Sequence, residues 1–142
     1  MRFNLPGFIL LFTTFAFSCT KENADTTKPH HLPGLWIGTY TTDQFPQQAP
    51  LYYSFIIKPD GTLLTEGKVS NGTTYYSSGA WTLNGDTLRC TYTTINFPNV
   101  KVTQSAKFFY NASAGTLTSG TWRDELNGSN YTGKFQNMVE VD

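Results

Sequence analysis

Tight turns at short intervals are the feature that most constrains the fold of this chain. Beyond Gly34, turn signals separate stretches in which apolar and polar residues alternate. The clearest of these signals are Pro59-Asp60-Gly61-Thr62, Ser70-Asn71-Gly72-Thr73 and Asn84-Gly85-Asp86. Pro presets φ and Gly supplies positive φ at such positions, and Asn-Gly is a strong hairpin signal. Connections this short force sequential strands to pair antiparallel, so the chain is predicted to be all-β.

The segments between the turns define the expected strands. About eight are predicted, over residues 35–42, 51–58, 62–69, 74–83, 87–95, 100–110, 116–123 and 131–141. An antiparallel up-and-down meander of this size exposes two edges unless it closes, and closure produces a small barrel. A β-sandwich is the alternative, although it would need a longer crossover between its sheets. Leu117 and Trp122 fall on opposite faces of one strand, so a β-bulge is expected near Gly120.

A Gly-x-aromatic pattern recurs on the predicted strands. All three tryptophans follow it, and one phenylalanine repeats it, in Gly34-Leu35-Trp36, Gly79-Ala80-Trp81, Gly120-Thr121-Trp122 and Gly133-Lys134-Phe135. We interpret the aromatic residues as core anchors, with Trp36 buried near the barrel floor and with Trp81 and Phe135 sharing the interior. The glycines are expected to allow close approach or curvature of the strands.

The first residues of the chain are typical of a secretory signal. Arg2 precedes an apolar run over residues 8–17, which is shorter than the ~20 residues that a membrane-spanning helix needs. Residues 1–18 are therefore predicted to be a signal peptide. Residues 19–33 are polar and contain Pro29 and Pro33, so they are expected to be a flexible tether. Residues 34–142 form the predicted barrel domain.

Composition and the placement of reactive residues point away from catalysis. Lys plus Arg and Asp plus Glu number 10 each, so no net field favours nucleic acid. His30 and His31 both lie in the tether, which leaves no Ser-His-Asp or Cys-His set in the domain and makes a weak metal site. Cys90 is expected to be a buried, unreactive thiol. We predict no enzyme activity, no cofactor, no metal and no nucleic-acid partner.

Two stretches resemble known families. Ser18-Cys19 resembles a bacterial lipobox, which implies that Cys19 is the lipid-modified first residue of the mature protein; an ordinary signal peptide is the alternative. The Gly-x-Trp within residues 32–40 resembles the opening of the lipocalin superfamily. Residues 79–83 leading to 85–88 are similar to small lipocalin-like lipoproteins of the Bacteroidetes type.

These resemblances imply a cellular location for the protein and a structural role for Trp36. The protein is expected at the bacterial cell envelope, at the outer membrane, with acylated Cys19 in the lipid bilayer. Trp36 is expected to close one barrel end beneath a basic residue late in the chain, for which Arg123 and Lys134 are the candidates.

Two functions remain open on the residues alone. The side chains expected to face inward are Trp36, Tyr40, Tyr53, Phe55, Thr65, Tyr75, Ser77, Gly79, Trp81, Cys90, Tyr92, Thr94, Gln104, Phe108, Phe135 and Asn137. In the first, the barrel binds a small apolar or amphipathic molecule through Tyr40, Tyr53, Phe55, Tyr75, Tyr92, Gln104 and Phe108, with its mouth near residues 43–50. In the second, the core is filled and the protein is structural or binds other proteins through Tyr52, Tyr76 and Phe109.

Overall fold

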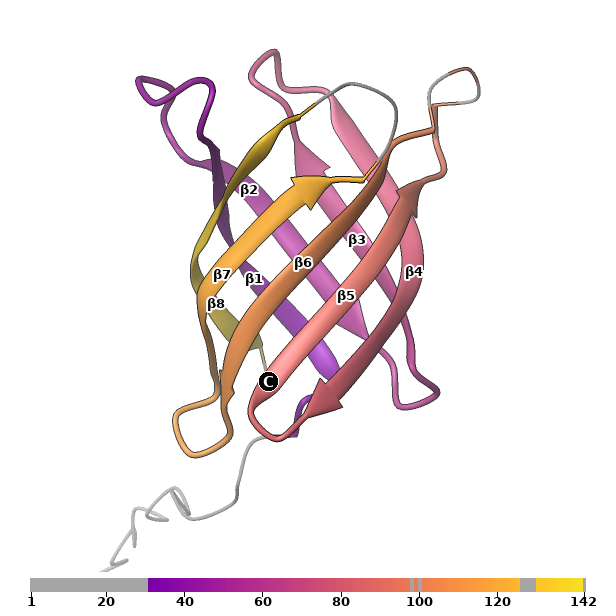
Figure 1. Cartoon of the computed structure of the whole chain (residues 1–142), viewed down its shortest axis with the longest axis vertical. Helices are drawn as coiled ribbons and strands as arrows, with labels where there is room; N and C mark the ends of the chain where they lie inside the picture. Colours follow the sequence, from indigo (N-terminus) through magenta and orange to yellow (C-terminus); the bar gives the residue numbers. More distant parts are fainter. Residues whose placement is uncertain (1–30, 98, 100, 126–129, 142) are drawn as a thin grey trace, which may run out of the picture.

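A closed antiparallel barrel is the fold of this chain in a computed structural model, which describes residues 31–97, 99, 101–125 and 130–141. Its strands are β1 (Gly34–Thr42), β2 (Leu51–Ile57), β3 (Thr62–Lys68), β4 (Thr74–Asn84), β5 (Thr87–Thr94), β6 (Thr103–Asn111), β7 (Thr116–Asp124) and β8 (Thr132–Val141). Each strand pairs with the next along the chain, and β8 returns to pair with β1 (Figure 1). The predicted eight-stranded meander and its closure into a barrel are confirmed.

The turn residues act as the sequence predicts. Gly61 and Gly72 adopt φ values of 84° and 83°. The Asp60 carboxylate accepts hydrogen bonds from the backbone N–H and the hydroxyl of Thr62, at 2.9 and 2.6 Å. These local contacts reverse the chain within a few residues and set the register of the strands that follow.

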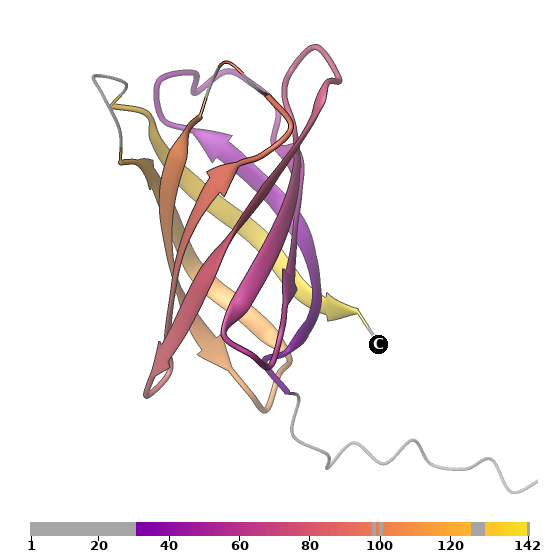
Figure 2. The ribbon, with the colours of Figure 1, turned by 90° about the vertical axis from the view of Figure 1, so that its right-hand side faces the viewer.

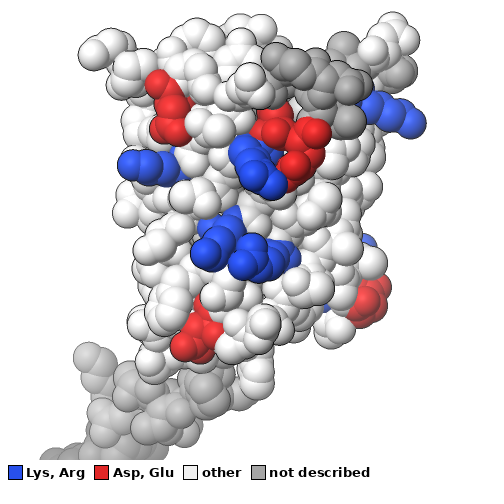
Figure 3. Space-filling model, in the orientation of Figure 1, with Lys and Arg blue, Asp and Glu red and all other residues white. Residues whose placement is uncertain are grey.

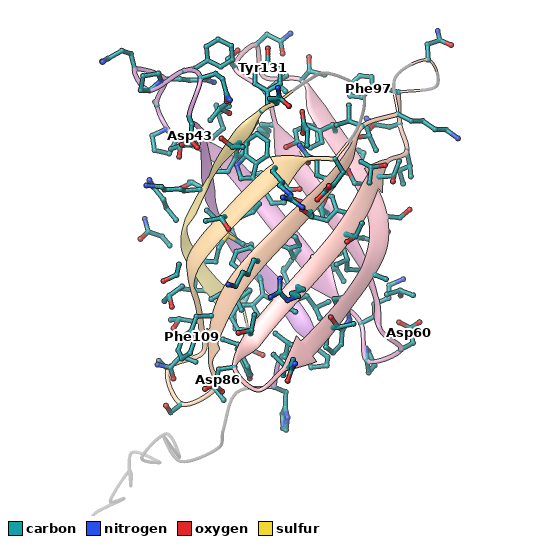
Figure 4. All side chains as sticks on the ribbon, viewed as in Figure 1. Asp43, Asp60, Asp86, Phe97, Phe109 and Tyr131 are labelled. Carbon is teal, nitrogen blue, oxygen red and sulfur yellow. The ribbon has the colours of Figure 1, made fainter. Side chains whose placement is uncertain are left out.

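The barrel has two different ends, which we call the floor and the mouth. The chain enters at the floor, where the β2–β3, β4–β5 and β6–β7 turns also lie, while the four other connections surround the mouth (Figures 1 and 2). Asp60, Asp86 and Phe109 mark the floor end and Asp43, Phe97 and Tyr131 mark the mouth end in Figure 4.

Trp36 closes the floor, as expected. Its side chain is fully buried, its indole N–H donates to the Leu32 carbonyl at 2.8 Å, and the Tyr110 ring meets it edge-on at 5.9 Å. Leu32, which the sequence places in the tether, is itself buried against this end of the barrel, and β1 begins two residues later at Gly34. Neither Arg123 nor Lys134 covers Trp36, because β7 and β8 carry both toward the mouth. Tyr110 occupies that place instead.

Aromatic rings fill the middle of the barrel. Phe55, Phe108 and Phe135 pack with ring centroids 4.9 to 5.4 Å apart, and Tyr53 lies 5.0 Å from both Phe55 and Phe135. Trp81 differs from the expectation, because it is only partly buried and packs at the edge of this core. Its indole N–H donates to the Lys58 carbonyl at 2.9 Å.

Two bulges set which side chains point inward. At Ser119, φ is 52° and the β6–β7 register shifts, so that Leu117, Gly120 and Trp122 are all buried; the bulge expected near Gly120 is confirmed. At Asn137, φ is 53° and the β1–β8 register shifts.

The bulge at Asn137 overturns part of the inward set. Asn137 is exposed and Met138 takes the interior position that the alternation assigned to it. Val139 and Val141, which strict alternation along the strand would place on the face of Phe135, are exposed for the same reason. A bulged residue reverses the alternation of every later side chain on its strand.

The surface is mostly uncharged, with acidic and basic groups interspersed on the face shown in Figure 3. Among the residues that the structure describes, no helix has the length and apolar character required to cross a bilayer.

Candidate binding site at the barrel mouth

An open cavity of about 500 Å³ occupies the mouth of the barrel. Strand ends and all four mouth connections contribute to its lining. The residues are Tyr40, Thr42, Phe45, Gln48, Leu51, Val69, Ser70, Tyr75, Thr94, Phe97, Val102, Gln104, Trp122, Asp124 and Tyr131. Aromatic and aliphatic side chains make up most of this wall, with a few polar groups among them, as is usual for small-molecule sites.

Large apolar side chains form the rim of the cavity. Phe45, Val69, Phe97 and Tyr131 are all exposed, although each lines the cavity on one side. The rings of Phe45 and Tyr131 stack with centroids 6.0 Å apart, which joins the β1–β2 loop to the β7–β8 connection. An apolar rim of this kind lets an apolar molecule enter without crossing a charged barrier.

Hydrogen bonds hold the aromatic wall in place. The Tyr40 hydroxyl donates to the Lys68 carbonyl at 2.9 Å, and the Trp122 indole N–H donates to the Thr41 carbonyl at 3.0 Å. The two rings meet nearly at right angles, with centroids 6.0 Å apart. A wall fixed in this way loses little conformational entropy when it receives a ligand.

Gly67 makes room for the Tyr75 ring in the opposite wall. The two residues pair across β3 and β4, and the tip of the Tyr75 ring lies where a Cβ on Gly67 would project. Tyr75 lies beside Tyr53 in the interior, with ring centroids 6.1 Å apart. Glycine at this position therefore sets the direction of Tyr75 and, with it, the shape of the cavity.

The lower wall carries one carboxylate. The Gln104 amide donates to the Asp124 Oδ1 at 2.8 Å, and both residues line the cavity. Glu125, the next residue, points to the exterior, where it accepts hydrogen bonds from Ser105 and, at 2.9 Å, from Arg123. These contacts lower the Glu125 pKa, the Ser105 hydroxyl contributing most.

A layer of tyrosines lies directly beneath the cavity. It surrounds a void of about 10 Å³, lined by Tyr40, Tyr53, Tyr75, Tyr92, Gln104, Trp122 and Phe135. The Tyr53 hydroxyl donates to Thr65 Oγ1 at 3.2 Å. The Tyr92 hydroxyl is fully enclosed, and among the described residues it has no partner with hydrogen-bond geometry, although the Tyr53 hydroxyl is close enough to perturb its ionisation.

Burial keeps these tyrosines protonated. Loss of solvation raises the pKa of Tyr53, Tyr75 and Tyr92 well above the ordinary value near 10, and raises that of Tyr40 less strongly. The layer is therefore a set of neutral hydroxyls that can donate and accept hydrogen bonds.

The structure separates the seven predicted ligand-binding residues into three levels. Tyr40, Tyr75 and Gln104 line the cavity, and Tyr53 and Tyr92 line only the void below it. Phe55 and Phe108 lie deeper, in the filled core, and line neither space.

Several lining residues are absent from that predicted set. Phe45 and Phe97 lie in connections, where strand alternation carries no information, and Tyr131, predicted to begin the last strand, lies just before β8. Trp122 becomes identifiable only when the bulge on β7 is placed correctly.

The exposed aromatic residues proposed as protein contacts do not share one surface. Tyr76 and Phe109 are 44% and 45% exposed, but Phe109 lies near the floor whereas Tyr76 is near the mouth end of β4. Tyr52 is partly covered by Lys68, whose Nζ lies 5.8 Å from the ring centroid.

The other potentially reactive side chains, a thiol and several carboxylates, do not come together in one place. Cys90 is a buried free thiol, and burial raises its pKa to about 12. Asp86 lies at the floor, at the opposite end from Asp124. Within the described ranges, no three His, Cys, Asp or Glu side chains form a group that could hold a metal. Cys19 and His30 lie outside the described residues. No protein-family model, curated protein or solved structure matches the chain.

Proposed function

We propose that this protein is a membrane-tethered, lipocalin-like barrel that holds a small apolar or amphipathic molecule in its mouth cavity. The observation that carries the proposal is the cavity itself. Its volume of about 500 Å³ falls within the range of roughly 300–1,000 Å³ that is usual for ligand sites, and its lining is mainly apolar.

The division of the barrel supports this use. The lower half is filled by aromatic side chains, which provide stability independently of any ligand. The upper half keeps open a cavity whose walls are fixed by Tyr40 and Trp122. Exposed apolar side chains at a concave site are a feature of binding surfaces.

Attachment of the chain at the floor end is compatible with membrane tethering and an accessible mouth. The chain enters the barrel at the floor, through Leu32, while the mouth lies at the other end (Figure 1). An acylated Cys19 would hold the protein at the outer membrane without placing its attachment point across the mouth. Labelling cells with a fatty-acid probe tests this step: Cys19→Ser should abolish the label and release the protein, and retained labelling would contradict it.

Ligand binding can be tested by blocking the mouth. Ser70 is an exposed turn residue on the cavity lining, so Ser70→Trp should place an indole over the opening with little effect on the core. Ser113, an exposed turn residue near the floor, provides the matched control as Ser113→Trp.

The readout is titration with an apolar naphthylamine dye whose fluorescence rises on burial. We expect saturable binding of one dye per barrel, weakened at least about tenfold by Ser70→Trp and unchanged by Ser113→Trp. Native extraction followed by mass spectrometry should also recover a co-purifying small molecule. If the native protein does not bind the dye, or if both variants bind it equally, the ligand-binding proposal is contradicted. The filled-core, protein-interaction function would then be the better hypothesis.

A further inference from the structure

The Tyr92 hydroxyl is a polar group without a partner at the base of the mouth cavity. It is fully enclosed, on a residue that lines the void of about 10 Å³, and it has no partner with hydrogen-bond geometry within the described part of the chain, although the Tyr53 hydroxyl lies close by. A buried hydroxyl of this kind costs free energy, and native structures rarely leave one unsatisfied. One water molecule in the void can supply this partner in the free protein, and a ligand hydroxyl that enters from the cavity can take the place of that water.

We propose that the ligand of the mouth cavity is an uncharged amphiphile that enters with its polar end first and places a single hydroxyl group against Tyr92 and Gln104. This inference rests on the proposed function, because it concerns the chemistry of the same site. The apolar part of the molecule occupies the cavity above, among the aromatic and aliphatic wall residues.

The size of the void selects the group that reaches Tyr92. A space of roughly 10–15 Å³, measured with a water-sized probe, holds about one water molecule, and hence one hydroxyl oxygen. The void and the cavity share Tyr40, Tyr75, Gln104 and Trp122, so the void lies next to the cavity and these side chains form the boundary between the two spaces. A carboxylate or phosphate carries two or more oxygens with their hydration, and it does not fit this space.

The charge of the lining selects against an anion. Among the described lining residues there is no Lys or Arg, and the ionisable acid is Asp124. Lys68, at the end of β3, holds its ammonium over the outer face of Tyr52. Residues 98, 100 and 126–129, in the neighbouring connections, contain no ionisable side chain in the sequence.

An anionic head group would thus be buried beside Asp124 without a cation to pair with it. The cost of burying an unpaired charge is large, so a fatty-acid anion is not expected to bind with its carboxylate at the base of the cavity. A hydroxyl group meets the polar groups correctly, because it can accept from Tyr92 and donate to the Gln104 amide oxygen.

Displacement of the naphthylamine dye by three amphiphiles of equal chain length tests the inference. The probes are decan-1-ol, decanoate and decylammonium, compared at about pH 8, where the acid is ionised and the amine is protonated. We expect decan-1-ol to displace the dye at a concentration at least about tenfold lower than decanoate. Equal or tighter binding of decanoate or decylammonium would overturn the inference.

Two variants locate the hydroxyl group. Tyr92→Phe removes one oxygen and keeps the ring, so it should weaken binding of decan-1-ol by about two- to tenfold relative to binding of the dye. Tyr110→Phe, beneath the core at the floor, removes a tyrosine hydroxyl far from the cavity and should change neither affinity. Unchanged decan-1-ol affinity in Tyr92→Phe would overturn the placement.

The outcomes separate the two proposals. If the native protein does not bind the dye, the proposed function is wrong, and this inference, which depends on it, is wrong as well. If the dye binds but the three amphiphiles compete equally, the proposed function stands and the inference fails. The amphiphile series uses the native protein, so it decides the matter even if Tyr92→Phe does not fold.

Discussion

The Trp122 indole N–H donates to the Thr41 carbonyl at 3.0 Å, although a strand lies between the two residues. Trp122 is on β7 and Thr41 is on β1, and the indole reaches across Gly133 on β8, with which Trp122 pairs. A Cβ on Gly133 would collide with both the indole and the Thr41 oxygen. Glycine at 133 therefore permits a link that closes the barrel and forms part of the cavity wall.

Gly133→Ala should destabilise the barrel strongly. The added methyl group meets backbone oxygen, which cannot move away as a side chain can, so we expect a loss of about 2–3 kcal/mol or more in the free energy of unfolding. Denaturant unfolding monitored by tryptophan fluorescence measures it.

Gly34→Ala is the matched control for this change. Like Gly133, Gly34 precedes an aromatic residue by two positions, but the nearest atom to a Cβ there is a Glu140 carboxylate oxygen at 3.3 Å, at the end of a flexible side chain. We expect its effect to stay within about 0.5 kcal/mol. Equal losses at the two positions would show that the crossing of Trp122 over Gly133 is not what makes residue 133 sensitive.

Gly67→Ala should change the cavity more than the stability. The new methyl group meets the tip of the Tyr75 ring, which can rotate away, so the unfolding free energy should fall by about 1 kcal/mol or less. The displaced ring moves into the cavity, and dye affinity should fall several-fold. In the double variant Gly67→Ala/Tyr75→Leu the smaller side chain should restore much of the affinity; no restoration would contradict the steric explanation.

The sequence was sufficient for the fold because its signals are local. Turn residues such as Asp60 and Asn71 make their hydrogen bonds within two residues, and short turns leave antiparallel pairing as the only arrangement. Closure then follows from the number of strands and the absence of any protected edge.

The details of the site could not be predicted to the same degree, for two physical reasons. The bulge at Asn137 reverses the facing of the residues after it, and nothing in the alternation around Asn137 and Met138 marks where this occurs. Phe45, Phe97 and Tyr131 lie in connections whose course depends on tertiary contacts, such as the stacking of Phe45 on Tyr131. The inward aromatic residues alone also give no indication of where packing ends and the cavity begins.

Cys90 should be unreactive until the barrel unfolds. It is buried, and burial raises the pKa of its thiol to about 12, so the reactive thiolate is scarce at about pH 8. The chain has two cysteines, so a Cys19→Ser background isolates this thiol. A colorimetric disulfide reagent should react slowly with the native protein and stoichiometrically after denaturation. Complete reaction of the native protein within minutes would contradict the buried position.

The tyrosine layer should make the barrel sensitive to alkali. Burial raises the folded-state pKa of Tyr53, Tyr75 and Tyr92 well above the unfolded value near 10. Below about pH 10 both states carry these protons and stability does not depend on them. Above it, the unfolded state releases protons that the folded state retains, so stability falls as pH rises.

The size of the effect predicts a cooperative transition. Each such tyrosine contributes up to about 1.4 kcal/mol per pH unit, so three could remove a typical stability of about 5–15 kcal/mol within a few pH units above 10. Phenolate absorbance and near-ultraviolet circular dichroism should therefore change together in one step. Tyr92→Phe should move the midpoint upward, while Tyr76→Phe, which removes an exposed hydroxyl, should leave it in place. Gradual ionisation of every tyrosine with no loss of tertiary signal would mean that the layer is open to solvent.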